Sequence, residues 1–147
     1  MFMYWRLQME WLVVIGVVIL VVFIISSELK ARKKQAALIE TLKSQGFSED
    51  YKMVGKPYVV LVDKSNQMLA FVGVEVSKKI EFSKVISWQH TYTEQNKTVN
   101  GVHNHSLINN KLEFTISDPD TPLIQVSVGN YEYAKQWSAR FSALFQS

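Results

Sequence analysis

Hydrophobic and polar positions change their spacing twice along this chain, and the changes divide it into three stretches. Residues 11–25, WLVVIGVVILVVFII, form an apolar run without a charged side chain. From residue 28 to 45, charged residues and alanines surround apolar positions at helical spacing, and Gly46 ends that pattern. Beyond residue 46 the spacing changes to two, which is typical of β-strands.

The apolar run is long enough, with its rims, to cross a membrane. Residues 9–27 approach the roughly 20 positions that a spanning helix needs. Their β-branched residues would favour a strand in water, but in lipid only a helix satisfies its own backbone hydrogen bonds. Tyr4, Trp5 and Trp11 fit an interfacial aromatic belt at the first end. We therefore expect a transmembrane helix over residues 11–27, preceded by a short segment, residues 1–10.

Charge sets the expected orientation. Residues 1–45 carry six cations and three acids, whereas the rest of the chain carries ten of each, so the net charge of +3 lies in the N-terminal third. Four cations follow the run, namely Lys30, Arg32, Lys33 and Lys34. They outweigh Arg6 before it, and such a basic flank stays in the cytoplasm. We expect a single-pass protein of a bacterial inner membrane, with residues 1–10 outside and the C-terminal domain cytoplasmic.

A cleaved signal peptide is the alternative to a permanent anchor. The run lacks a strongly basic n-region and is followed by F-I-I-S-S-E, in which Ser26 and Ser27 are small enough to leave cleavage open. The flanks as a whole favour an uncleaved anchor.

Residues 28–46 are predicted to form a basic juxtamembrane helix. In the simpler interpretation this helix is solvated and its four cations lie at the membrane surface, where each is worth about 1 kcal/mol against anionic headgroups. Inner-membrane lipids are therefore expected partners. A coiled-coil stalk is the alternative; it has few heptads but leaves homo-oligomerisation open.

Period-two alternation predicts short strands between residues 58 and 128. The clearest stretches are residues 58–63, 68–73, 112–117 and 124–128, separated by turns such as D-K-S-N-Q and by the breaker D-P-D-T-P. One polar and one apolar face are typical of an antiparallel sheet packed on one side. After Gly129-Asn130, a candidate N-cap, the apolar positions fall on one helical stripe: Tyr133, Ala134, Trp137, Phe141, Leu144 and Phe145.

Six or seven strands followed by one helix resemble the pleckstrin-homology-like (PH-like) fold, a bent seven-stranded antiparallel sheet capped by a C-terminal helix. The resemblance rests on the strand series from Tyr58 to Val128 and on YEYAKQWSARFSALF with Trp137, and F-S-K-V-I-S-W is also similar to small bacterial domains of this type. It implies a PH-like cytoplasmic α+β domain over residues 47–147. A lipocalin-like or other small β-barrel is the alternative.

The sequence shows no catalytic motif. It has no G-x-S-x-G, no phosphate-binding glycine loop and no paired carboxylates, so we expect no enzyme and no cofactor. Residues 46–147 carry balanced charge, which argues against nucleic acid, and the absence of cysteine excludes disulfides. The PH-like resemblance implies headgroup recognition at the first strand turn, which here offers only Lys64, with Lys78 and Lys79 one hairpin later.

The three histidines are candidate metal ligands. His103 and His105 share a face in extended chain, but carboxylates or thiolates that would complete a site with His90 are not evident, so we expect no metal. Ile86, Trp88, His90 and Tyr92 are expected on one inward strand face, and His90 then fits a hydrogen-bonded core histidine.

A single anchor with a small cytoplasmic domain and no catalytic motif resembles the entry-exclusion proteins of conjugative elements, which sit in the recipient's inner membrane and block redundant transfer. The resemblance implies that the chain binds another membrane protein, or a conjugation or phage protein. The polar segment 94–110, expected as an exposed loop or frayed hairpin, is the candidate recognition surface. Its candidate partner-binding residues are Lys97, Asn100, His103, Asn104 and His105. An adaptor of a host envelope complex and an anionic-lipid-binding PH-like domain are the alternatives.

Overall fold

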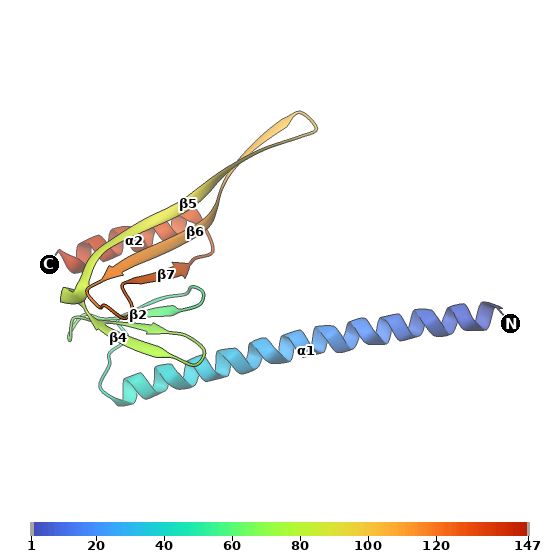
Figure 1. Ribbon diagram of the computed structural model, residues 1–147, viewed down its shortest axis with the longest axis horizontal. Coiled ribbons are helices and arrows are strands. Elements are labelled where there is room, and N and C mark those ends of the chain that lie inside the picture. Colours follow the sequence, from blue (N-terminus) through green and yellow to red (C-terminus); the bar gives the residue numbers. More distant parts are fainter. Residues whose placement is uncertain (1, 147) are drawn as a thin grey trace.

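The computed structural model describes residues 2–146 and shows a long N-terminal helix, two antiparallel sheets and a C-terminal helix (Figure 1). Helix α1 runs without a break from Phe2 to Ser44, so the expected transmembrane and juxtamembrane helices are one helix. Its most apolar part has a mean hydropathy of 2.9 and is not buried in protein. The prediction of one N-terminal helix able to span a membrane agrees with this, by length and composition.

The expected α+β class is confirmed, but the expected single bent sheet is wrong. The first sheet has the order β1–β2–β3–β4 and the second has the order β5–β6–β7, with all neighbours antiparallel. The strands are β1 (Tyr51–Met53), β2 (Val59–Asp63), β3 (Met68–Val72), β4 (Ser77–Glu81), β5 (Val85–Val99), β6 (Val102–Ile116) and β7 (Leu123–Ser127).

The sheet is divided at the 3₁₀ turn η1 (Phe82–Lys84), where the chain leaves β4 and begins β5 without pairing the two strands. On the other side, the Lys56 N–H donates to the Ser127 carbonyl at 2.9 Å and the Ser127 N–H donates to the Lys56 carbonyl at 2.7 Å. Alternation along a sequence indicates single strands and not which edges pair, which is why the expectation failed.

The main core lies between the two sheets and helix α2 (Tyr131–Phe145). As predicted, α2 buries its apolar stripe: Trp137 is 3% exposed and meets Tyr51 of β1 edge-on, with ring centroids 6.5 Å apart. The helix begins at the predicted cap, because the Asn130 side chain accepts a hydrogen bond from the Tyr133 N–H at 2.8 Å. The C-terminal helix therefore covers the core as the sequence indicates.

A second core lies on the other face of the first sheet. In this core, Ile39 and Leu42 of α1 and the following Phe47 pack against β2 and β3. The buried strand residues are Val59, Leu61, Ala70 and Val72. Strand β2 is buried on both faces, although one packed face was expected. The last turns of α1 are therefore packed on the sheet through Ile39 and Leu42, while Lys30, Arg32, Lys33 and Lys34 before them are exposed.

Strands β5 and β6 form a hairpin that extends beyond the rest of the domain (Figure 1). Its turn is Asn100-Gly101, where both residues have positive φ values of 52° and 78°, as a tight two-residue hairpin turn requires. Strand β7 pairs only with residues 111–115 of β6. The outer part, residues 93–108, is called the hairpin arm below; it contains most of the segment expected as a loop or frayed hairpin.

The predicted inward face of β5 is partly wrong. Trp88 is half-buried against Phe145, with ring centroids 4.8 Å apart, but Ile86 is 65% exposed. The pairing register shifts between Val85 and Ser87, and this irregularity turns Ile86 away from the face of Trp88. Tyr92 is also exposed.

Candidate functional site

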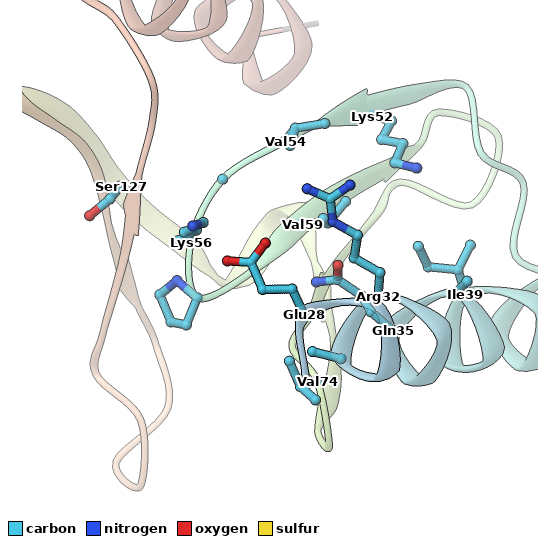
Figure 2. Close-up of a pocket in the computed structure, with 14 residues that line it drawn as sticks. Glu28, Arg32, Gln35, Ile39, Lys52, Val54, Lys56, Val59, Val74 and Ser127 are labelled. Carbon is cyan, nitrogen blue, oxygen red and sulfur yellow. The ribbon is translucent and has the colours of Figure 1, made fainter. Parts of the chain in front are cut away.

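Two surfaces outside the cores of the described chain are candidate sites: the hairpin arm and a groove between α1 and the β1–β2 connection. The groove encloses about 930 Å³, a size typical of ligand sites. Helix α1 forms one wall with residues between Glu28 and Ile39, and residues 52–59 form the other (Figure 2). It is called the helix–sheet groove below.

The helical wall of the groove is held against the first sheet by several contacts. The Gln35 side-chain amide donates to the Val72 carbonyl at 2.8 Å, and Lys34 forms an exposed ion pair with Glu75 at 3.4 Å. Ile39 and Leu42 add buried apolar contact. An exposed ion pair contributes little, so the apolar contact and the Gln35 hydrogen bond fix this wall.

The opposite wall depends on a close approach between distant segments. A side chain at Gly55 would collide with the Val126 side chain and lie 2.9 Å from the Ser127 carbonyl, so only glycine fits there. The paired hydrogen bonds between Lys56 and Ser127 hold the next residue. The backbone of Lys56 is therefore fixed, while its exposed side chain borders the groove.

The charged lining of the groove is mainly basic. Three cations, Arg32, Lys52 and Lys56, border it together with one carboxylate, Glu28. Figure 2 shows that the Arg32 and Glu28 side chains rise from α1 toward the β1–β2 connection. The ion pairs within residues 2–146 involve Lys34, Lys43 and Lys78, so none neutralises the three groove cations.

Apolar side chains complete the groove. Ile39 and Val59 are buried at its base, and Val54 and Val74 are 60% and 39% exposed at its rim. An apolar base with a cationic border suits a ligand that carries both an anionic group and an apolar part.

The five predicted partner-binding residues all lie on the hairpin arm, but on different faces of it. Lys97 is paired with Asn104, whereas His105 and His103 are paired with Asn96 and Thr98 at the neighbouring positions. Paired residues share a face and successive pairs alternate. The structure therefore brings Lys97 and Asn104 together on one face, His103 and His105 on the other, and Asn100 into the turn.

Side chains of the arm contact mainly one another. The Thr98 hydroxyl and His103 Nδ1 are 2.8 Å apart, and His105 Nδ1 and Asn96 Oδ1 are 2.7 Å apart. All residues from 96 to 106 are exposed. These cross-strand contacts order the arm without attaching it to the core.

His90 lies at the base of the arm. Its Nε2 is 3.0 Å from Asn110 Oδ1, and its ring packs on Tyr131 with centroids 5.0 Å apart, so it is hydrogen-bonded as expected but only half-buried. The residue paired with His105 is Asn96, six positions along β5 from His90, or roughly 20 Å at the rise of a strand. In the part of the chain that the structure describes, no three His, Cys, Asp or Glu residues are grouped as a metal site.

The four membrane-surface cations predicted on α1 have different surroundings. Arg32 borders the groove, Lys34 pairs with Glu75, and Lys30 and Lys33 are exposed. The sequence analysis missed Lys52 and Lys56, because the groove exists only once α1 packs on the first sheet. The continuous apolar stretch V-V-L-V in β2, typical of a strand buried on both faces, was the signal for that packing.

Comparisons of this chain with protein-family models, curated proteins and solved structures found no match. The PH-like and entry-exclusion resemblances therefore stay predictions, and function rests on the geometry of the groove and the arm.

Proposed function

We propose that this protein is a non-catalytic binding module, anchored in the inner membrane of a bacterium, with its folded domain in the cytoplasm. Its hairpin arm binds another protein. The observation that carries the proposal is the arm itself: exposed residues extend beyond the sheet, and their side chains make local contacts that the core does not need.

The base of the arm supports a binding role because it is firmly held. Asn110 is 4% exposed; its side-chain amide donates to the Leu107 carbonyl at 3.1 Å and its own carbonyl accepts from the Val128 N–H at 2.9 Å. An isolated two-stranded hairpin is marginal in water, so a fixed base is what keeps such an arm extended. Recognition segments on rigid scaffolds are typical of binding proteins.

The edges of the arm suggest how a partner binds. Strand β7 covers β6 only over residues 111–115, so the outer backbone edges of the arm have no pairing strand within residues 2–146. Free edges favour the addition of an extended segment of another protein, with alternate side chains giving specificity. Lys97 and Asn104 would contact such a partner on one face, and His103 and His105 on the other.

The position of the arm favours a partner at the membrane. The arm and the apolar half of α1 project from the same side of the domain (Figure 1). The four cations after the apolar run favour a cytoplasmic domain. Together with the resemblance to entry-exclusion proteins, this arrangement supports exclusion by capture of an inner-membrane protein of an incoming conjugative element.

A shortened arm tests the proposal. Glu94 is paired with Leu107, so residues 95–106 can be replaced by Asn-Gly, which joins this pair through a new two-residue turn. In a recipient carrying the full-length variant, we expect conjugation of the related element to return to the level without the protein, while expression, insertion and melting temperature stay unchanged.

Two further variants distinguish the two faces of the arm. Replacing Lys97 and Asn104 by serine, and His103 and His105 by serine in a second variant, assigns exclusion to one face. Full exclusion by the shortened variant would overturn the role of the arm. If the unaltered protein excludes no element but crosslinks through Asn100→Cys to a host membrane protein, the adaptor role replaces exclusion.

A further inference from the structure

We propose that the helix–sheet groove binds the phosphate-bearing headgroup of an anionic phospholipid in the membrane that α1 enters. This site differs from the hairpin arm in position and chemistry, and it does not depend on the proposed protein partner.

One end of the groove lies close to the end of the apolar run. The apolar run ends at Ile25, and a helix rises about 1.5 Å per residue, so Glu28 lies roughly 5 Å and Arg32 roughly 10 Å beyond the end of the run. The polar layer of each leaflet is about 5–8 Å thick. Because α1 is continuous, the Glu28 end of the groove lies in the headgroup layer, Arg32 lies just outside it, and Ile39 at the far end lies roughly 21 Å beyond the run.

The second argument is charge. Arg32, Lys52 and Lys56 reach the groove from two walls, and none is neutralised by an ion pair of the described chain. Arginine binds phosphate oxygens with two parallel N–H groups, and lysine adds a point charge. Glu28 stands at the membrane end of the groove, and with three cations against this one carboxylate the lining keeps a net positive charge that suits an anionic phosphate.

The third argument is the apolar rim. Val54 of the β1–β2 connection and Val74 of the β3–β4 turn border the groove and are 60% and 39% exposed; Val76 in the same turn is 61% exposed. The β3–β4 turn is attached to α1 by the Lys34–Glu75 ion pair, roughly 13 Å beyond the end of the apolar run. Exposed valines are unfavourable in water, and beside a cationic groove they suit an amphiphile better than a bare inorganic anion. A soluble phosphate would not use them, so the rim favours a lipid as the source of the phosphate.

The test compares two variants of the full-length chain that lose equal charge. Arg32→Gln with Lys56→Gln removes two groove cations; Lys30→Gln with Lys33→Gln removes two cations of α1 that do not line the groove. None of these four side chains makes a hydrogen bond or ion pair within residues 2–146, so both variants should fold like the parent. Each protein is reconstituted in nanodiscs of phosphatidylcholine with a minor fraction of phosphatidylglycerol.

Native mass spectrometry then gives the fraction of protein that retains each lipid. We expect the parent and the Lys30/Lys33 variant to retain phosphatidylglycerol in preference to phosphatidylcholine, and the Arg32/Lys56 variant to retain about tenfold less of it. Because the chain has no cysteine, Val54→Cys can carry a single polarity-sensitive dye, whose emission should shift to the blue in discs with the anionic lipid.

Three results would overturn the proposal. Equal losses in both variants would show a diffuse surface charge with no defined site. Equal retention of the two lipids by the parent would show that the groove does not select an anion. Displacement of the bound lipid by excess inorganic phosphate would show that the groove takes a free anion from solution.

Discussion

The two sheets of this protein differ in how much of their surface the rest of the chain covers. The first sheet is enclosed, because α1 covers one face of β2 and β3 and the main core covers the other. The second sheet shares the main core with α2, but its two longest strands extend into the exposed arm. The covered sheet attaches α1 to the rest of the domain, whereas the outer part of the other sheet stays exposed.

The largest expected effect comes from the residue that joins both sheets. Phe114 of β6 is fully buried, with its ring centroid 5.2 Å from that of Phe71 in β3 and 5.1 Å from that of Phe141 in α2. Phe114→Ala should lower the free energy of unfolding by about 3–5 kcal/mol, because it opens a cavity where three elements meet. Thermal melting of the full-length protein in detergent measures it; an unchanged melting temperature would mean that the sheets do not share this core.

The second prediction concerns the packing of α1 on the first sheet. Leu42 is 3% exposed in the core with β2 and β3. Leu42→Ala should cost about 2–4 kcal/mol, and hydrogen exchange should rise in β2 and β3 more than in β6 and β7. Gln45→Ala just after the helix, where the side chain is exposed, is the control. Equal exchange in all four strands would contradict the separate role of the second core.

The third prediction concerns Asp63 at the end of β2. Burial raises the pKa of its carboxyl, but hydrogen bonds from the Ser48 N–H at 3.0 Å and from the Asn66 N–H and side-chain amide, at 3.0 and 2.7 Å, outweigh burial and hold the pKa below the ordinary value of 3.8. A lowered pKa stabilises the fold above the unfolded value, and this stability is lost as the pH falls through the folded value.

Asp63→Asn replaces one accepting oxygen by a donor, so at neutral pH it should cost about 1–3 kcal/mol. The difference from the parent should shrink as the pH falls below about 4, where the parent loses its charge-assisted bonds. Chemical denaturation at several pH values measures both effects. A difference that stays constant down to pH 2 would contradict the role of the charged carboxylate.

The smallest effect is expected at the tip of the arm. Val99 and Val102 are paired next to the turn and are 56% and 59% exposed. Replacing both by threonine should change the free energy of unfolding by less than about 0.5 kcal/mol, because little apolar area is buried there. A loss comparable with that of Leu42→Ala would mean that the arm is covered by the protein itself, or by a second copy, and is not available to a partner.

The sequence predicted the elements whose signals are local. The stripe of α2, the inward Trp137 and the Asn130 cap follow from helical periodicity and capping chemistry. Asn100-Gly101 between two valines is also a local hairpin signal, and it indicates that the flanking strands continue to the turn. The division into two sheets was not readable, since it depends on a short 3₁₀ turn and on which edges pair.

The groove also could not be predicted from local patterns. Gly55 and Lys56 are positioned by Val126 and Ser127, about 70 residues later in the chain, and the opposite wall comes from α1. Alternation and helical spacing describe neighbours in sequence, whereas this site is made by contacts between three segments far apart. The charge pattern identifies all the cations on α1. Only the packing of α1 on the first sheet shows that Arg32 lines the groove and that Lys30 and Lys33 do not.

Because α1 is unbroken, a change in the tilt of its apolar part would be passed directly to the folded domain. The helix contains neither glycine nor proline between Gly16 and its end at Ser44, and its last turns are packed on the first sheet. Spanning helices tilt when the hydrocarbon layer is thinner than their apolar stretch, here roughly 23 Å for residues 11–25, and a helix without a hinge transmits that tilt along its length. In a hydrocarbon layer thinner than that run, the tilt would rotate the whole domain relative to the membrane surface and displace the tip of the arm most.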